Sequence, residues 1–116
     1  MKMISFFEVI RRALTGPYHT EEEFDLEILV PKLKEVVQKY DIRYDAQTPI
    51  PSDDSLADRV FEAALEFYAA VGTYCVDTGR VIRFTREEIV EGLKDAPAAS
   101  VFGEGRDAKV MVGRKP

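Results

Sequence analysis

A glycine-rich stretch near the end of the chain, Gly103-Glu104-Gly105-Arg106-Asp107, has the composition of an anion-binding loop. A phosphate loop needs backbone N–H groups that converge on the anion, and it normally lies between a strand and the start of a helix. Here a short apolar run, residues 108–113, follows the glycines, and the lysine and hydroxyl residue of a P-loop are missing. These features favour a plain turn over a phosphate site. Anion binding by Gly103–Arg106 is kept as the weakest of three functional hypotheses.

The sequence contains one cysteine, Cys75, and one histidine, His19, which is too few for an intrachain disulfide or a tetrahedral zinc site. Cys75 lies in a predicted strand where only Arg80, across a predicted hairpin, could supply positive charge, so a buried structural thiol is favoured over a reactive one. His19 precedes a predicted helix, whose dipole disfavours a charged imidazole, so a neutral exposed residue is favoured over a catalytic base. We therefore expect no catalytic, cofactor-binding or metal-binding residue in this chain.

Composition indicates a folded chain of one domain, residues 1–116. Hydrophobic residues make up 46% and charged residues 32% of the sequence, and its length suffices for one core. The net charge of −5 disfavours nucleic-acid binding, and no apolar run approaches the roughly 20 residues of a membrane span. Glu8 and the pair Arg11–Arg12 interrupt the apolar N-terminus, which predicts an amphipathic helix of a cytoplasmic protein and not a signal peptide.

Periodicity and capping residues predict about four helices. The first runs over residues 3–14 with Phe6, Phe7, Ile10, Ala13 and Leu14 on its apolar face. The second begins at Thr20, with Glu23 completing a capping box, and Pro31 predicts a kink or a junction of two helices at Val30. Its buried stripe is expected to comprise Leu26, Leu29, Val30, Leu33, Val36, Val37 and Tyr40. A third helix, residues 54–71, is expected to bury Leu56, Val60, Ala63, Ala64, Phe67 and Ala70 and to end at Gly72. A fourth follows Thr85 and Glu88, which form a second capping box.

Between the last two helices, the sequence predicts a small hairpin in which residues 73–76 pair with 80–84 around Asp77-Thr78-Gly79. Residues 108–113 are a possible further strand. The predicted fold class is thus mainly α (α+β), with about four helices, one small β-hairpin and a possible extra C-terminal strand. Two strands form a marginal sheet alone, so they must pack on the helices or on a partner.

Two segments together closely resemble the N-terminal part of the monomethylamine methyltransferases. The shared residues are Tyr74, Cys75, Asp77, Thr78, Arg80, Thr85, Glu88 and Ile89, followed by Gly103, Gly105, Arg106, Asp107 and Ala108. Upstream the similarity is looser and includes Asp25-Leu26, Pro31, Lys39-Tyr40 and Ile50-Pro51. The resemblance therefore extends over nearly all of the chain.

This resemblance implies an enzyme with a large (β/α)₈-type barrel that contains pyrrolysine, binds the amine as an adduct on that residue, and passes the methyl group to Co(I) of a corrinoid partner protein. In the family, the barrel and the pyrrolysine lie downstream of everything present here. The resemblance thus assigns no catalytic residue and no cofactor to this chain, with the corrinoid on the partner. Tyr74, Cys75, Asp77, Thr78, Arg80, Gly103, Gly105, Arg106 and Asp107 are family landmarks whose role it leaves open.

Our first hypothesis is that the chain is the N-terminal domain, or a truncated homologue, of a monomethylamine methyltransferase that is not catalytic alone. The second is a stand-alone interaction or regulatory module that binds a methyltransferase or corrinoid protein. In either case the strands and helices leave edges that the missing barrel, a separate subunit or a second copy would cover. We therefore expect an exposed hydrophobic patch and self-association of the isolated chain.

Overall fold

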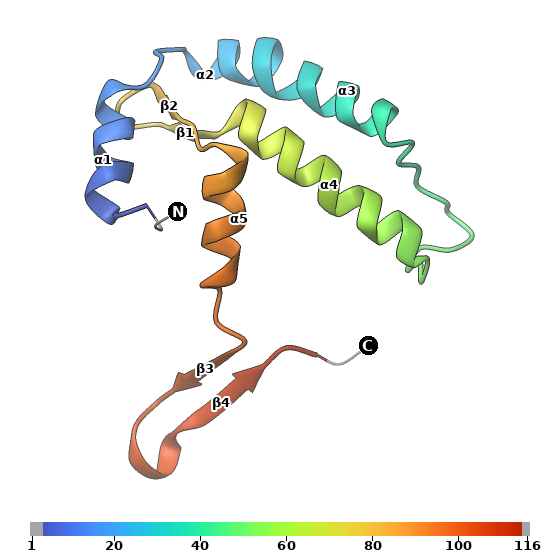
Figure 1. Ribbon diagram of the computed structural model, residues 1–116, viewed down its shortest axis with the longest axis vertical. Coiled ribbons are helices and arrows are strands. Elements are labelled where there is room, and N and C mark those ends of the chain that lie inside the picture. The colour runs from blue at the N-terminus through green and yellow to red at the C-terminus, as the bar shows by residue number, and fades with distance from the viewer. Residues whose placement is uncertain (1–3, 115–116) are drawn as a thin grey trace.

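The structure, a computed structural model, describes residues 4–114. Figure 1 shows an N-terminal group of helices around a small hairpin, and a second hairpin that projects from it. The elements in chain order are α1 (Phe6–Thr15), α2 (Glu21–Glu23), the π-helical segment η1 (Phe24–Leu29), α3 (Val30–Lys39), α4 (Asp54–Val71), β1 (Thr73–Cys75), β2 (Arg80–Ile82), α5 (Arg86–Lys94), β3 (Ala99–Phe102), the short 3₁₀ segment η2 (Gly105–Asp107) and β4 (Lys109–Val112). Because α2, η1 and α3 are continuous, the described part of the chain has four helices, which confirms the predicted mainly α fold. Met3, the predicted start of the first helix, lies outside the described residues.

The helices begin where side chains can cap them. Thr20 and Glu23 form the expected capping box at α2, and Thr85 and Glu88 form the second one at α5. At α4 the carboxylate of Asp53 accepts a hydrogen bond from the N–H of Ser55. These reciprocal bonds satisfy N–H groups that have no partner within the helix.

Pro31 leaves the second helix unbroken but changes its winding. Pro31 has no N–H to bond to the carbonyl group four residues earlier. The segment just before it, η1, takes the wider π-helical turn, and the chain then continues as α3. The π-helical turn shifts the side-chain register relative to an α-helix, so Leu26 is 61% exposed and Phe24, outside the predicted stripe, is buried.

Two antiparallel hairpins replace the single predicted one. In the first, Thr73 lies opposite Ile82 and Cys75 lies opposite Arg80, so the paired region is shorter than predicted. In the second, β3 pairs with β4, with Ala99 opposite Val112. The predicted C-terminal strand is therefore present, and its partner is a segment that the sequence pattern did not identify as a strand.

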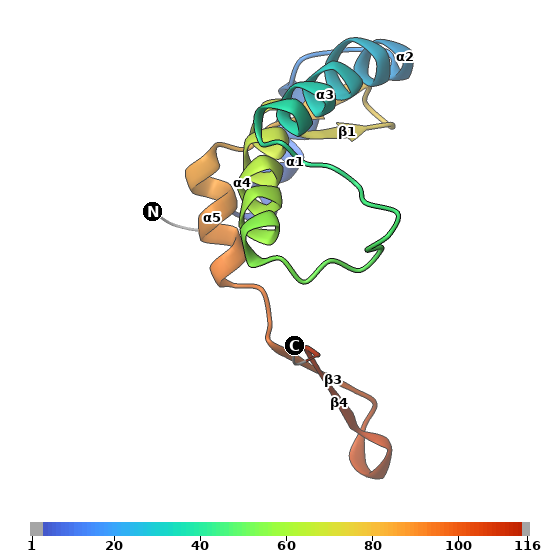
Figure 2. The same cartoon turned by 90° about the vertical axis from the view of Figure 1, so that its right-hand side faces the viewer.

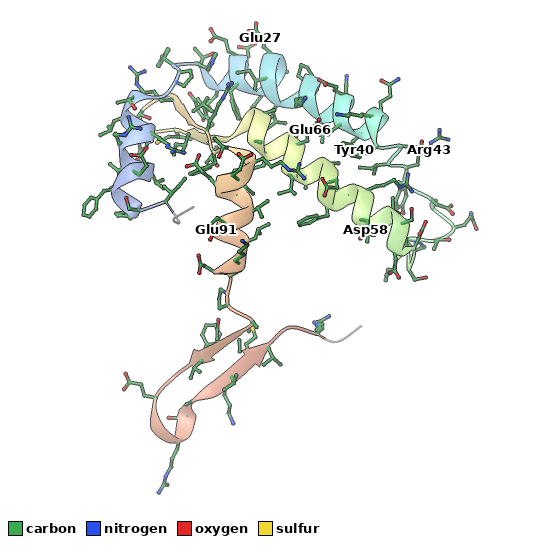
Figure 3. The ribbon with its side chains drawn as sticks, viewed as in Figure 1. Glu27, Tyr40, Arg43, Asp58, Glu66 and Glu91 are labelled. Carbon is green, nitrogen blue, oxygen red and sulfur yellow. The ribbon has the colours of Figure 1, made fainter. Side chains whose placement is uncertain are left out.

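The helices α3 and α4 lie side by side, as Figures 1 and 2 show. The ammonium group of Lys39 on α3 contacts a carboxylate oxygen of Glu66 on α4 at 2.5 Å, and Figure 3 shows Glu66 on the side of α4 that faces α3. The guanidinium of Arg59 donates to the carbonyl oxygens of Tyr40 (3.1 Å) and Asp41 (2.7 Å) at the end of α3. These contacts of charged side chains hold the C-terminal end of α3 against the side of α4.

The core is small and lies where η1 and α4 meet the first hairpin. Its centre comprises Phe24, Val71 and Val81, with Ile28, Leu29, Phe67 and Tyr74 packed around it. The other buried apolar residues are Val36, Ala63, Leu65 and Ile82. Helix α1 contacts β2 but leaves Phe6, Phe7 and Leu14 at least 60% exposed, so these residues of its predicted apolar face are not covered by the part of the chain that the structure describes. Leu33, Val37 and Val60 are also exposed, against expectation. Among residues 4–114, no helix is both long and apolar enough to cross a membrane.

Candidate functional site

The landmark residues around the first hairpin hold the loop that follows α1. Three side chains of the hairpin donate hydrogen bonds to backbone carbonyl groups of the last turn of α1 and of the loop after it: Thr78 Oγ1 to Ala13 O (2.7 Å), Arg80 Nη1 to Gly16 O (2.7 Å) and Tyr74 Oη to His19 O (2.8 Å). We call Tyr74, Thr78 and Arg80 the loop clamp. Each bond joins positions more than fifty residues apart in the sequence.

Backbone groups reinforce the loop clamp. The N–H of His19 donates to the carbonyl of Gly79 (2.9 Å), and the N–H of Val81 donates to the carbonyl of Pro17 (3.0 Å). An isolated antiparallel bridge pairs Tyr18 with Arg80. The loop between α1 and α2 therefore lies beside β2 much as a third strand would, and the side chains of the clamp fix its course.

The loop clamp is continuous with the core. The ring of Tyr74 stacks on Phe24 with centroids 5.2 Å apart, while its hydroxyl group reaches His19. Burial raises the pKa of the Tyr74 phenol. A phenol held in this way stays protonated and acts as a hydrogen-bond donor, so its role here is to position the loop.

Cys75 and Asp77 belong to the same hairpin but not to the clamp. Cys75 is a free, half-buried thiol, and hydrogen bonding by Thr78 lowers its pKa. Arg80, which was expected to be the positive neighbour of Cys75, directs its guanidinium to the carbonyl of Gly16 instead. Asp77 is exposed in the turn. The half-buried position fits the structural interpretation of Cys75 only in part, since some of the side chain remains accessible.

His19 is half-buried and not exposed as predicted. Its carbonyl oxygen accepts the bond from Tyr74, and its Nδ1 lies 3.7 Å from a carboxylate oxygen of Glu23. Within residues 4–114, no group of three or more His, Cys, Asp or Glu side chains is arranged to hold a metal ion. The arrangement around His19 thus offers backbone contacts rather than a nucleophile and a base.

The terminal glycines form the turn of the second hairpin, as favoured over the phosphate site. Gly103 and Gly105 both have positive φ (85° and 58°), and they flank η2, which leads into β4. Arg106 and Asp107 are exposed in this turn, and neither forms an ion pair with another residue that the structure describes. The second hairpin lies far from the loop clamp (Figure 1), so the two landmark segments do not form one site.

A charged junction between α1 and α5 was not anticipated from the sequence. The guanidinium of Arg12 binds both carboxylate oxygens of Glu88, at 2.7 and 3.1 Å, and it also donates to the carbonyl of Arg83 at 2.9 Å. It lies 5.5 Å from the centre of the Phe84 ring. Hydrogen bonds from Arg12 lower the pKa of Glu88. The capping pattern identified Glu88, but nothing local in the sequence indicates its partner.

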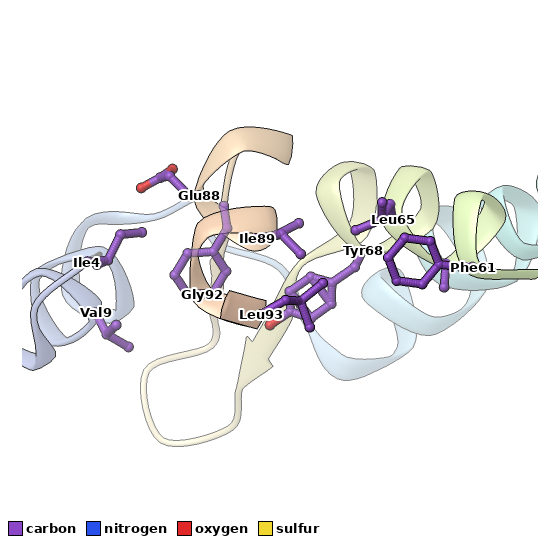
Figure 4. A pocket seen from close by; sticks show the side chains of 11 residues that line it. Ile4, Val9, Phe61, Leu65, Tyr68, Glu88, Ile89, Gly92 and Leu93 are labelled. Carbon is purple, nitrogen blue, oxygen red and sulfur yellow. The ribbon is translucent and has the colours of Figure 1, made fainter. Parts of the chain in front are cut away.

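An apolar groove of about 540 Å³ lies between α1, α4 and α5 (Figure 4). Its walls include Val9, Phe61, Leu65, Tyr68, Ile89 and Leu93, and Glu88 lies at its edge. The hydroxyl group of Tyr68 is engaged with that of Thr73 at 2.6 Å. With so few free polar groups, the groove suits an apolar side chain better than a small polar substrate.

Comparison with known proteins places these features in context. The sequence profile of the family described as "Monomethylamine methyltransferase MtmB" matches residues 4–116. MtmB1 of Methanosarcina barkeri is 31% identical over 107 residues, which cover 92% of this chain and 23% of that protein. MtmB of Methanosarcina mazei is 31% identical over 121 residues, covering 99% of this chain and 26% of that protein. The chain thus spans about a quarter of the length of these relatives.

The fold is also similar to a solved structure. The crystal structure of the Methanosarcina barkeri monomethylamine methyltransferase (MtmB) superposes with a TM-score of 0.84 and 30% sequence identity. The superposition covers 93% of this chain and 23% of the other. A crystal structure of the hydroxylamine MtmB complex gives the same values.

Proposed function

The chain belongs to the monomethylamine methyltransferase MtmB family, and from that premise we propose that it serves as the N-terminal segment of an enzyme that transfers the methyl group of monomethylamine to a corrinoid protein. The family membership confirms the resemblance to the N-terminal segment expected from the sequence. The observation that carries the proposal is the match of fold and sequence together, a TM-score of 0.84 at 30% identity over 93% of the chain.

In this proposal, the chain contributes structure and the remainder of the enzyme contributes chemistry. The loop clamp and the junction of Arg12 with Glu88 use their polar groups on backbone and on each other. Catalysis would depend on the part of a family-length enzyme that this chain does not cover. The resemblance implies that this part holds the barrel and the pyrrolysine and that the corrinoid protein binds there. We further propose a cytoplasmic location and a role in methanogenesis from methylamine.

A second candidate is a stand-alone interaction module for a methyltransferase or a corrinoid protein. Among residues 4–114, twenty large hydrophobic residues are exposed, a number that favours a chain with an extensive partner surface. Both candidates require a partner for the apolar surface, but only the first requires that the chain replace the N-terminal segment of a relative.

The first candidate is tested with a chimera. The chain replaces the aligned segment of Methanosarcina barkeri MtmB1, and methyl transfer is followed by the absorbance of methylcobalamin after addition of monomethylamine and reduced corrinoid protein. We expect the chimera to transfer the methyl group and the 116-residue chain alone to give no methylcobalamin. Turnover by the chain alone would contradict the proposed division of labour. A folded but inactive chimera, together with binding of the chain to the intact enzyme or to the corrinoid protein, would favour the second candidate.

A further inference from the structure

The chain exposes far more surface than a compact protein of its mass. Its accessible surface is 9279 Å², whereas a compact monomer of 13.1 kDa would expose about 6,400 Å². Its radius of gyration is 17.8 Å, against about 13 Å for a compact chain of this length. The excess is at least as large as the share of one partner in a permanent protein–protein interface, about 1,000–2,500 Å². A large covering partner is therefore consistent with the area left open.

The second hairpin is the part of the chain with the least cover. Figures 1 and 2 both show β3 and β4 standing away from the helices. All residues of the hairpin except Ser100 are exposed. Since a two-stranded hairpin is at best marginally stable in water, this one needs a surface to pack on.

One face of the hairpin is entirely apolar. Side chains alternate between the two faces of a strand, so the register of β3 with β4 groups Ala99, Val101, Val110 and Val112 on one face. We call this set the valine face. Val101 lies directly opposite Val110, and the two side chains are 67% and 63% exposed. The other face, with Ser100 and Lys109, is mixed in polarity.

The relatives indicate what covers the valine face. This open shape superposes, over 93% of the chain, on a solved protein of which it covers only 23%. The extended arrangement is therefore one that the family adopts in the presence of a much larger body of protein. That body is large enough to bury an excess surface of this size.

We propose that the valine face docks on the methyltransferase body, by which we mean the part of a family-length enzyme that this chain does not cover. The inference rests on the proposed function, because it takes the occupant of the face from the family. It adds a defined role to the landmark turn at Gly103–Asp107, which sets the pairing of β3 with β4 and so brings the valines onto one face.

Hydrogen exchange tests the docking. Amide exchange of β3 and β4 is measured in the 116-residue chain alone and in the chimera with the Methanosarcina barkeri body. We expect fast exchange in the chain alone and at least about tenfold slower exchange in the chimera. Equally fast exchange of the hairpin in a chimera whose helices are protected would overturn the inference. The unmodified Methanosarcina barkeri enzyme gives a second readout that needs no graft, since its corresponding hairpin must also be protected.

Matched substitutions identify the face. Val101→Asp with Val110→Asp in the chimera should restore fast exchange in the hairpin, whereas Val76→Asp should leave it slow. Val76 is a fair control because it is 68% exposed and lies at the turn of the first hairpin. Protection in the chain alone that rises with concentration and is lost in Val101→Asp would assign the face to a second copy of the chain, and would overturn the docking on the body.

The two proposals fail separately. If the chimera transfers methyl groups but the amides of its second hairpin exchange fast, the proposed function holds and the docking proposal is wrong. If the amides of the hairpin exchange slowly but the chimera transfers no methyl group, the docking proposal holds and the proposed function is contradicted. Neither readout depends on the other, because exchange is measured without substrate.

Discussion

The guanidinium of Arg12 and the carboxylate of Glu88 form a bidentate ion pair that joins α1 to α5, and the two residues are 76 positions apart in the sequence. Their side chains are only 23% and 11% exposed. Glu88 also accepts the N–H of Thr85, so one carboxylate caps α5 and holds α1 at the same time. Because α1 has no buried residue of its own, this pair is a main attachment of the helix to the rest of the chain.

Removal of the guanidinium should therefore destabilise the fold measurably. We expect Arg12→Ala to lower the free energy of unfolding by about 1–3 kcal/mol, because it leaves a shielded carboxylate without its partner. Urea denaturation followed by circular dichroism measures the change. Arg11→Ala is the matched control, since the Arg11 side chain is 61% exposed and its partner among residues 4–114 is Glu8 of its own helix. Equal effects of the two substitutions would show that the junction contributes nothing beyond a surface pair.

The stability of the chain should fall in acid. Arg12 lowers the pKa of Glu88, and Arg11 and Arg12 lower the pKa of Glu8 from its ordinary value of 4.5 to about 2. A carboxyl group whose pKa is lower in the folded state stabilises that state above its unfolded pKa, and this contribution disappears as the pH falls through the folded value. The thermal midpoint should thus decrease between pH 4.5 and about pH 2.

Glu88→Gln should make the thermal midpoint of unfolding less dependent on pH below pH 4.5, and it should lower that midpoint at pH 6. Glu104→Gln, which alters an exposed carboxylate in the turn of the second hairpin, should leave the profile unchanged. A midpoint that is constant from pH 5 to pH 2 in the unmodified chain would refute the role of these carboxylates.

The loop clamp makes a separate prediction. We expect Thr78→Val to cost about 1 kcal/mol of stability, because the carbonyl of Ala13 loses its donor while the shape of the side chain is kept. Tyr74→Phe should act in the same direction, since it retains the stacking on Phe24 but removes the bond to His19. Tyr44→Phe, at a residue that is 80% exposed, is the control. Amide exchange of residues 16–19 should rise in the clamp variants, and unchanged exchange there would contradict the clamp.

Local chemistry in the sequence predicted the starts of the second, third and fourth helices correctly, whereas the first helix begins at Phe6 and not near residue 3. The capping boxes at Thr20 and Thr85 depend on residues three positions apart, and both formed as expected. The third helix was predicted with its observed bounds, since Asp53 and Gly72 mark its two ends. Rules of this kind work because the donor and the acceptor belong to the same turn.

Features that depend on distant partners were not predictable in the same way. The apolar stripe of α1 was identified, but periodicity cannot tell whether its partner lies in the same chain, and Phe7 is 81% exposed. The motif at 74–80 was noticed as a resemblance, yet its acceptors are backbone carbonyls more than fifty positions away, which no side-chain pattern records. The strand β3 was missed because four residues without clear alternation become a strand only through pairing with β4.

The turn of the second hairpin gives the last prediction, which separates two glycines that look alike in sequence. At Gly103, φ is 85° and an added methyl group would lie 2.7 Å from the carbonyl oxygen of Asp107. At Gly105, φ is 58° and an added methyl group would meet no atom within 4 Å. Gly103→Ala should therefore disrupt the pairing of β3 with β4, whereas Gly105→Ala should only weaken it, by about 1 kcal/mol.

Amide exchange and cross-strand nuclear Overhauser effects between Val101 and Val110 measure this difference. If the hairpin docks on the methyltransferase body as proposed, Gly103→Ala in the chimera should also expose the valine face. The fluorescence of a dye that binds exposed apolar surface should then increase, whereas Gly105→Ala should leave it unchanged. Identical behaviour of the two variants would mean that the backbone geometry of Gly103 is not required, and the turn would then have no part in presenting the face.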